Sequence, residues 1–196
     1  MVLYNSIINF IKKIKTIKTK EDLIENFKTC KLGKKNSLMV ASWMHKNPKL
    51  INYCWEIIKA EEEPLNRRAA YAIDNCSEHY KGSVHHLIPA LINFLPKTNS
   101  NAVRRHLSRI LNQNPFTNDE DLQGQLAECC FNFLVGVNVD VAVKANCIDL
   151  LFKLCKIYPD LEYEFHSVLQ DQLEKNTTAF CNRAKKILSG DYKIKN

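Results

Sequence analysis

The sequence contains little glycine and little proline. Five glycines and six prolines in 196 residues are too few for the many tight turns of a β-sandwich or β-barrel. It also lacks a run of 18 apolar residues, so we expect no transmembrane segment. Hydrophobic residues make up 45% of the chain and charged residues 25%, which excludes a disordered chain. These values favour a globular protein without a β-sheet.

The eight cysteines form no Cys-x-x-Cys pair, and most of them occupy apolar helix faces. Cysteines used in this way are typical of small buried side chains in a reducing compartment. No secretory signal is apparent, because the lysines follow the uncharged stretch 2–11 instead of preceding it. We therefore expect a soluble, cytoplasmic protein.

Apolar residues recur at i, i+4, i+7 and i+8, the stripe of an amphipathic helix, at a period of 35 to 40 residues. One set of stripes, the A helices, begins at Leu50, Leu87, Leu126 and Leu161. A second set between them, the B helices, begins at Leu65, Val103, Val143 and Phe180. A less regular pair at 20–31 and 35–46 precedes these, with a capping box predicted at Thr19 and Asp22. Glycines at 33, 82, 136 and 190 fall at predicted helix ends, where a left-handed residue is expected.

Two segments of this pattern resemble a HEAT repeat. The first is Leu87-Ile88-Pro89-Ala90-Leu91, with proline in helix A, and the second is Asn101-Ala102-Val103-Arg104-Arg105, with Val-Arg opening helix B. Val143-Lys144 repeats the second feature, and 66–70 resembles it more loosely. The aspartate common in the turn of HEAT units is missing before Arg104. The resemblance covers roughly residues 48–190. The chain resembles small bacterial HEAT-like repeat proteins of unassigned function, and this resemblance implies a binding surface.

The predicted fold is all-α, a right-handed α-α superhelix (HEAT-like solenoid) of about five antiparallel helix pairs plus an N-terminal helix. We expect a single domain over 1–190. Within it, 1–18 would be a capping helix and 19–190 the helical repeats, with 191–196 a frayed tail.

The net charge of +7 is concentrated at the two ends, since residues 1–35 carry +6 and 183–196 carry +4. Between them, the A segments hold 13 acidic and three basic residues, and the B segments hold 11 basic and four acidic residues. In HEAT-like solenoids the B helices line the concave face, so the resemblance implies a basic concave patch for another protein with an acidic surface. The predicted binding residues are Arg67, Arg68, Arg104, Arg105, Arg109 and Lys144. The alternative is that these charges pair with carboxylates of neighbouring helices.

Candidates for chemistry are few. Cys76, His79, His85 and His86 could surround a metal ion, but their spacing matches no zinc signature. We interpret them as a buried thiol and surface histidines, and predict neither metal nor cofactor.

The predicted function is non-catalytic binding of a protein partner. The alternative is a nucleic-acid binder or an enzyme similar to the HEAT-like DNA glycosylases for alkylated bases. Trp43, Tyr71 and Asp74 would then stand near Arg104, Arg105 and Arg109.

Overall fold

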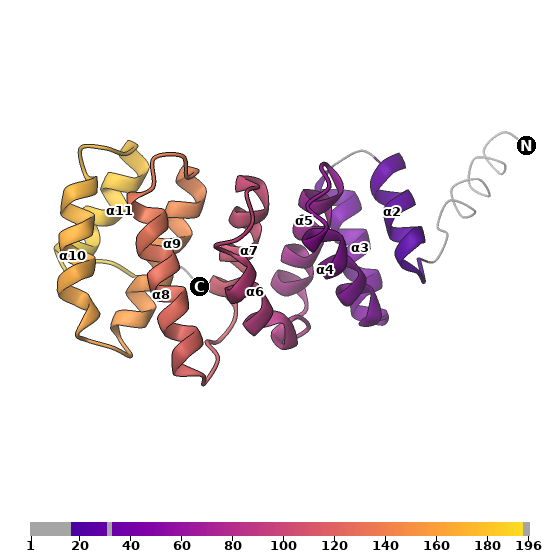
Figure 1. The fold of residues 1–196 in the computed structure, drawn as a ribbon, viewed down its shortest axis with the longest axis horizontal. Coiled ribbons are helices and arrows are strands. Elements are labelled where there is room, and N and C mark those ends of the chain that lie inside the picture. The colour runs from indigo at the N-terminus through magenta and orange to yellow at the C-terminus, as the bar shows by residue number, and fades with distance from the viewer. Residues whose placement is uncertain (1–16, 31–32, 194–196) are drawn as a thin grey trace, which may run out of the picture. The chain divides into compact units, whose positions relative to one another are not determined.

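The computed structural model describes residues 17–30 and 33–193. All regular structure in these residues is helical, and no strand occurs among them, which confirms the predicted all-α class. The ten α-helices follow the predicted order of A and B segments (Figure 1). The predicted N-terminal helix lies outside the described residues, except for Ile17 and Lys18, which precede the first described helix.

Contacts divide the chain into two compact units, 1–76 and 77–196, and the boundary falls inside α5 (Leu65–His79). The first unit contains α2 (Lys20–Thr29), α3 (Lys34–Lys46) and α4 (Lys49–Lys59) together with most of α5. The predicted capping box opens α2, because Asp22 N donates to Thr19 Oγ1 at 3.1 Å and Thr19 N donates to Asp22 Oδ2 at 3.2 Å. Helix α4 packs against both α2 and α3.

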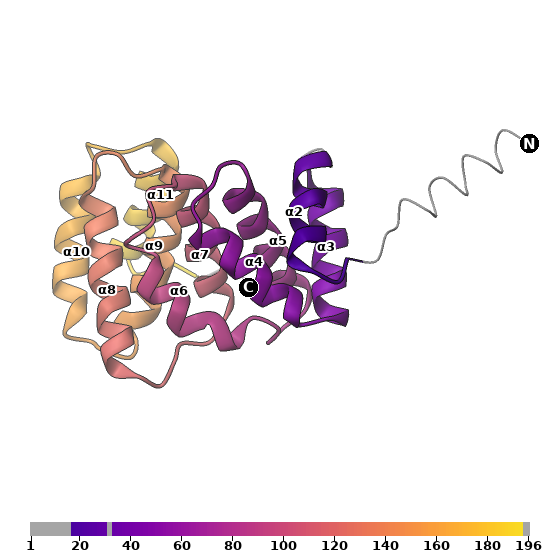
Figure 2. The ribbon, with the colours of Figure 1, turned by 45° about the vertical axis from the view of Figure 1, so that its right-hand side comes forward.

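The second unit contains three antiparallel pairs. They are α6 (Ile88–Phe94) with α7 (Asn101–Gln113), α8 (Glu120–Val135) with α9 (Val141–Cys155), and α10 (Leu161–Gln172) with α11 (Thr178–Leu188). Helices α6, α8 and α10 lie side by side in one layer, and α7, α9 and α11 form the other (Figures 1 and 2). The predicted A helices of this unit therefore form one layer, and the predicted B helices form the other.

Helix α6 is shorter than the predicted A segment 83–96. A short 3₁₀ helix (His85–Leu87) precedes it, and Pro89 lies in its first turn. Proline fits this position because the first N–H groups of a helix have no intrahelical partner, whereas further along its ring would clash with a carbonyl.

The predicted apolar stripes form the core of each unit. Of the 32 stripe residues, all are buried except Phe94, Leu161, Val168 and Leu188, which are half-buried. Gly82 and Gly190 adopt the predicted left-handed conformation, with φ of 79° and 80°. Gly33 and Gly136 do not, because their φ angles are 177° and −63°.

The end of the described chain packs on α9. Tyr192 donates its hydroxyl to Asp149, and its ring meets that of Phe152 edge-on with the centroids 5.0 Å apart. The stretch predicted as a frayed tail thus includes one residue that packs on the last repeats.

Candidate functional site

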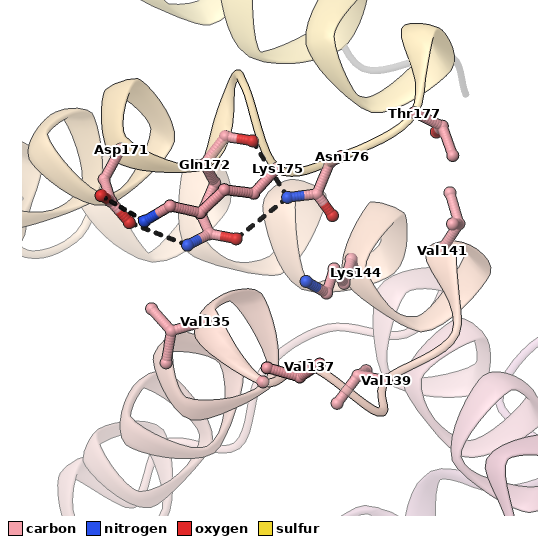
Figure 3. Close-up of a pocket in the computed structure, with 11 residues that line it drawn as sticks. Val135, Val137, Val139, Val141, Lys144, Asp171, Gln172, Lys175, Asn176 and Thr177 are labelled. Atoms are coloured by element: carbon pink, nitrogen blue, oxygen red, sulfur yellow. Dashed lines mark hydrogen bonds and ion pairs between the residues drawn. The ribbon is translucent and has the colours of Figure 1, made fainter.

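A pocket of about 720 Å³ lies where the loops of the last two helix pairs meet. One wall comes from the end of α8, the loop 136–140 and the start of α9 (Figure 3). The other comes from the end of α10, the loop 173–177 and Thr177, which caps α11. The pocket therefore lies at the N-terminal ends of two B helices, where helix dipoles favour negative charge.

Valines dominate the first wall. Val135, Val137 and Val141 are 49%, 94% and 39% exposed, and the loop between them brings Val139 against Gly136. A Cβ added at Gly136 would lie 2.8 Å from Val139 Cγ2 and 3.2 Å from Asn132 O. The glycine is therefore required by space and not by its backbone angles. Large exposed aliphatic side chains gathered in one place are typical of a contact surface.

Lys144 is the one charged side chain of this wall that is buried. It is 6% exposed, yet its ammonium points into the pocket (Figure 3). Within the described part of the chain, the ammonium makes no hydrogen bond or ion pair. Burial lowers the pKa of Lys144, because desolvation disfavours the charged form.

Polar side chains of the opposite wall bond to one another. Lys175 Nζ donates to Asp171 Oδ1 at 2.6 Å, and Gln172 Nε2 donates to Asp171 Oδ2 at 2.8 Å. Asn176 Nδ2 donates to the Oε1 of Gln172 at 2.9 Å (Figure 3). These bonds lower the pKa of Asp171, that from Lys175 contributing most. Since Asp171 and Lys175 cancel, the pocket keeps the single positive charge of Lys144.

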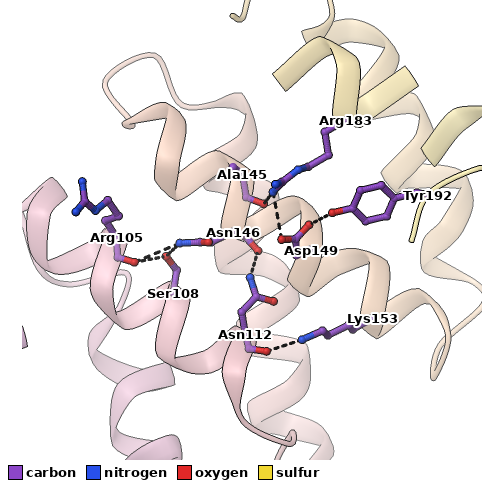
Figure 4. Close-up of polar contacts among 9 residues, drawn as sticks. All are labelled: Arg105, Ser108, Asn112, Ala145, Asn146, Asp149, Lys153, Arg183 and Tyr192. Atoms are coloured by element: carbon purple, nitrogen blue, oxygen red, sulfur yellow. Dashed lines mark hydrogen bonds and ion pairs between the residues drawn. The ribbon is translucent and has the colours of Figure 1, made fainter. Parts of the chain in front are cut away.

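A second polar feature joins the B helices of the 77–196 unit. Asn146 Nδ2 on α9 donates to Ser108 Oγ at 2.9 Å and to Arg105 O at 3.2 Å on α7 (Figure 4). In the opposite direction, Asn112 Nδ2 on α7 donates to Asn146 O on α9 at 3.0 Å. Lys153 Nζ donates to Asn112 O at 2.5 Å. We call these contacts and their equivalents the B-helix ladder.

The ladder recurs at each step. Asn114 Nδ2 donates to Ser77 Oγ at 2.8 Å, and in the first unit Asn75 Nδ2 donates to Ser37 Oγ at 2.8 Å. Between α9 and α11, Arg183 occupies the place of the asparagine. Its Nη1 donates to Ala145 O at 2.8 Å and to Asp149 Oδ2 at 3.2 Å (Figure 4). Most ladder side chains reach the preceding B helix, and Asn112 reaches the following one, so the ladder fixes the register between neighbouring repeats.

A family model described as HEAT repeat domain matches residues 24–190 of this chain. The chain belongs to the HEAT repeat family. Neither a curated protein nor a solved structure matches it. HEAT repeats generally mediate contacts between proteins. The serine–asparagine ladder stands between B helices of this HEAT chain, whose sequence lacks the turn aspartate before Arg104.

In the first unit of this HEAT chain, the predicted binding residues Arg67 and Arg68 already have partners. Arg67 is exposed, and its Nε lies 3.4 Å from Glu63 Oε2. Arg68 donates through Nη1 to the carbonyl of Phe27 and, at 3.0 Å, to that of Cys30. Arg68 thereby caps the C-terminal end of α2, where carbonyls lack helical partners.

In the 77–196 unit, the guanidinium of Arg104 lies over the ring of Phe133. The distance from its central carbon to the ring centroid is 5.1 Å. Arg109 Nη2 forms an ion pair of 2.8 Å with Glu78. The side chain of Arg105 is exposed, and within the described residues no side-chain bond holds it (Figure 4). Of these three predicted residues, Arg105 is therefore the uncommitted cation, and Arg109 is already paired.

The candidates for chemistry are placed as follows. Asp74 is fully buried, so its carboxylate does not face a bound base. Cys76 is buried, and His79, His85 and His86 are exposed. Over the described residues, no three His, Cys, Asp or Glu side chains are grouped so that they could hold a metal ion. No helix among those residues is long and apolar enough to cross a membrane.

The sequence pattern predicts Lys144 as a binding residue but does not predict the valines beside it. Valine occupies alternate positions from 135 to 141, a period of two that is typical of a strand. The structure places these valines at a helix end, in a loop and at a helix start, so that four apolar side chains gather in one place. Exposed valines in a loop are the signal that could have located the pocket.

Proposed function

We propose that this HEAT protein is a non-catalytic binding module or scaffold, and that it holds an acidic segment of a partner protein in the Lys144 pocket. The observation that carries the proposal is Lys144, a residue that is 6% exposed and whose ammonium has no counterion among the described residues. A carboxylate that enters the pocket would restore the interaction that Lys144 lost on burial.

The walls indicate what surrounds that carboxylate in the partner. Val135, Val137 and Val141 offer apolar contact within the same pocket as the ammonium. An aliphatic side chain next to a glutamate or aspartate therefore matches both features. A bare anion would use only Lys144 and leave the valines in water, so the pocket fits a peptide better than inorganic phosphate.

The acidic partner was predicted to lie along arginines of several B helices. We keep the class of partner but move the main contact to Lys144, with Arg105 as a second uncommitted cation. Arg68, Arg104 and Arg109 hold other groups of the chain and would have to release them to bind a phosphate backbone. This arrangement favours a protein partner over nucleic acid. Eight free cysteines support the proposed cytoplasmic location, because thiols persist in a reducing compartment.

The experiment uses the full chain and two short peptides in isothermal titration calorimetry. One is a blocked peptide with the core Val-Glu-Val, and the other carries Val-Gln-Val. The glutamate peptide should bind more tightly to the native chain. Lys144→Met should weaken it by about 10- to 100-fold, the value of a charge-assisted hydrogen bond. Lys185→Met is the matched control, because Lys185 is exposed on α11 and does not line the pocket.

A second measurement separates loss of binding from loss of folding. Because burial lowers the pKa of Lys144, its charged form is disfavoured in the folded state, so Lys144→Met should raise the free energy of unfolding at pH 7. Equal affinity for both peptides, or an equal effect of Lys144→Met and Lys185→Met, would refute the proposal. A salt dependence as steep as that of a phosphate binder, seen with DNA and not with peptide, would favour the nucleic-acid alternative.

A further inference from the structure

A groove of about 560 Å³ runs between α8 and α10, on the layer of the 77–196 unit opposite the B-helix ladder. The two helices lie side by side in both views (Figures 1 and 2). We call it the α8–α10 groove, and it is lined in particular by Glu120, Ala127, Glu128, Phe131, Tyr158 and Glu164. It shares none of its lining residues with the Lys144 pocket.

The charge of the groove is opposite to that of the chain. Four of its lining residues are acidic and exposed, and none is basic. They are Glu120, Glu128, Asp160 and Glu164. Among the residues that the structure describes, none of the four carboxylates forms an ion pair. The sequence as a whole carries +7, so a basic ligand has no general attraction to this protein and is favoured only locally.

The floor of the groove is apolar and aromatic. Phe131 and Tyr158 are half-buried, and the small residues Gly124 and Ala127 let a ligand approach the axis of α8. The aliphatic stem of a lysine or arginine packs along such a surface, and its cation is attracted to the face of an aromatic ring. The exposed carboxylates and the half-buried rings that line the groove therefore select the same kind of side chain.

The groove also contains a spare hydrogen-bond acceptor. Gln123 is 8% exposed, and its Nε2 donates to Thr117 O at 2.5 Å. Its Oε1 is buried and has no hydrogen-bond partner among the described residues. Buried acceptors are normally bonded, so a small rotation of the Gln123 side chain that exposes this oxygen would let it accept from an N–H donor of a ligand.

We propose that the α8–α10 groove binds a basic segment of a partner protein, in an extended conformation along α8. Glu120 and Glu128 are eight residues apart on one stripe of α8, which separates them by about 12 Å along the helix axis. An extended peptide covers that distance in about four residues, at about 3.3 Å per residue. The segment therefore carries two lysines or arginines four positions apart, because residues at i and i+4 of an extended chain point to the same side.

The test is titration of the full chain with a blocked peptide whose core is Arg-Ala-Ala-Ala-Arg, at low salt and at 0.15 M salt. A peptide with glutamine in place of both arginines is the negative probe. The arginine peptide should bind, and the double variant Glu120→Gln with Glu128→Gln should weaken it by about tenfold, because two exposed charge pairs are lost. Phe131→Leu keeps an apolar floor without the ring and should weaken the arginine peptide by about threefold.

Two controls make the result specific. Glu162 is exposed on the same helix as Glu164 but does not line the groove, so Glu162→Gln should leave the affinity unchanged. Lys144→Met should also leave it unchanged, which separates this site from the proposed acidic-peptide pocket. Equal losses in Glu162→Gln and in the double variant would mean general electrostatic attraction and would overturn the proposal. Binding of the glutamine peptide as tightly as the arginine peptide would also overturn it.

Discussion

Leu107 tests the repeat register most directly, because it sits in the middle of the α7 stripe and is 0% exposed. Leu107→Ala removes three carbon atoms, which costs about 2.4 kcal/mol at about 0.8 kcal/mol for each buried methylene. A cavity that cannot collapse raises the total to as much as about 5 kcal/mol. We therefore expect the free energy of unfolding to fall by about 2–5 kcal/mol.

Guanidinium denaturation followed by circular dichroism measures this loss as a lower midpoint at unchanged slope. Arg105→Ala is the matched control, since Arg105 lies two residues away and is exposed, and it should change stability by less than about 0.5 kcal/mol. In a thermal scan, Leu107→Ala should lower Tm by roughly 5–15 °C for a chain of this size. A loss below about 0.5 kcal/mol would mean that Leu107 does not face the core, and would refute the register of the B helices.

Three further predictions concern the ladder and the titratable groups. Asn146→Ala loses two hydrogen bonds to α7 and should cost about 1–2 kcal/mol in chemical denaturation, whereas Asn93→Ala, whose exposed amide bonds only within its own helix, should cost less. Burial raises the pKa of Asp149 despite its bonds to Tyr192 and Arg183. Its ionisation therefore lowers stability as pH rises above its ordinary pKa of about 4, and Asp149→Asn should flatten the stability–pH curve there, which pH-dependent unfolding would show. Burial raises the pKa of Cys155 to about 11, so native Cys155 should react with iodoacetamide at pH 8 about 100-fold more slowly than free cysteine, and peptide mass mapping measures this.

The helices could be predicted because the signals that define them are local. An apolar stripe at i, i+4, i+7 and i+8 depends only on the period of the helix, and the repeated stripe adds a second check. The capping box at Thr19 is likewise complete within four residues. Helix α6 is the exception, because Pro89 divides the predicted segment into a 3₁₀ turn and a shorter helix.

The ladder was missed although its spacing is that of the repeat. Asn75, Asn114 and Asn146 follow their serine partners by 38, 37 and 38 residues. From the sequence alone, an asparagine on a helix is predicted to be a surface residue. Its hydrogen-bond partner is more than 30 positions away, so no local pattern reveals the bond. Only the packing of successive B helices brings the amide to the serine.

The candidate site was predicted in part. Charge sorting by helix set pointed to the B helices and named Lys144, but could not tell which cations were already engaged. Nothing in the sequence distinguishes Arg68 from the other arginines. Its role as a cap on α2 becomes visible only when the positions of Phe27 and Cys30 in the fold are known. The Lys144 pocket depends on two loops from different repeats, and loop positions carry no periodic signal.

To bind an acidic partner, each cation must release the groups or the water that it now contacts. The loss of affinity expected when a cation is neutralised depends on how much it must release. Arg68 would leave two helix-end carbonyls, and Arg109 would leave Glu78, although an exposed pair of this kind contributes only about 0–1 kcal/mol. Arg105 gives up only its hydration. Lys144 has already lost most of its hydration and has no partner among the described residues, so a carboxylate gains the most there. The affinity for an acidic segment should therefore fall most for Lys144 and less for Arg105, whereas Arg68 and Arg109 would first have to release their partners within the chain.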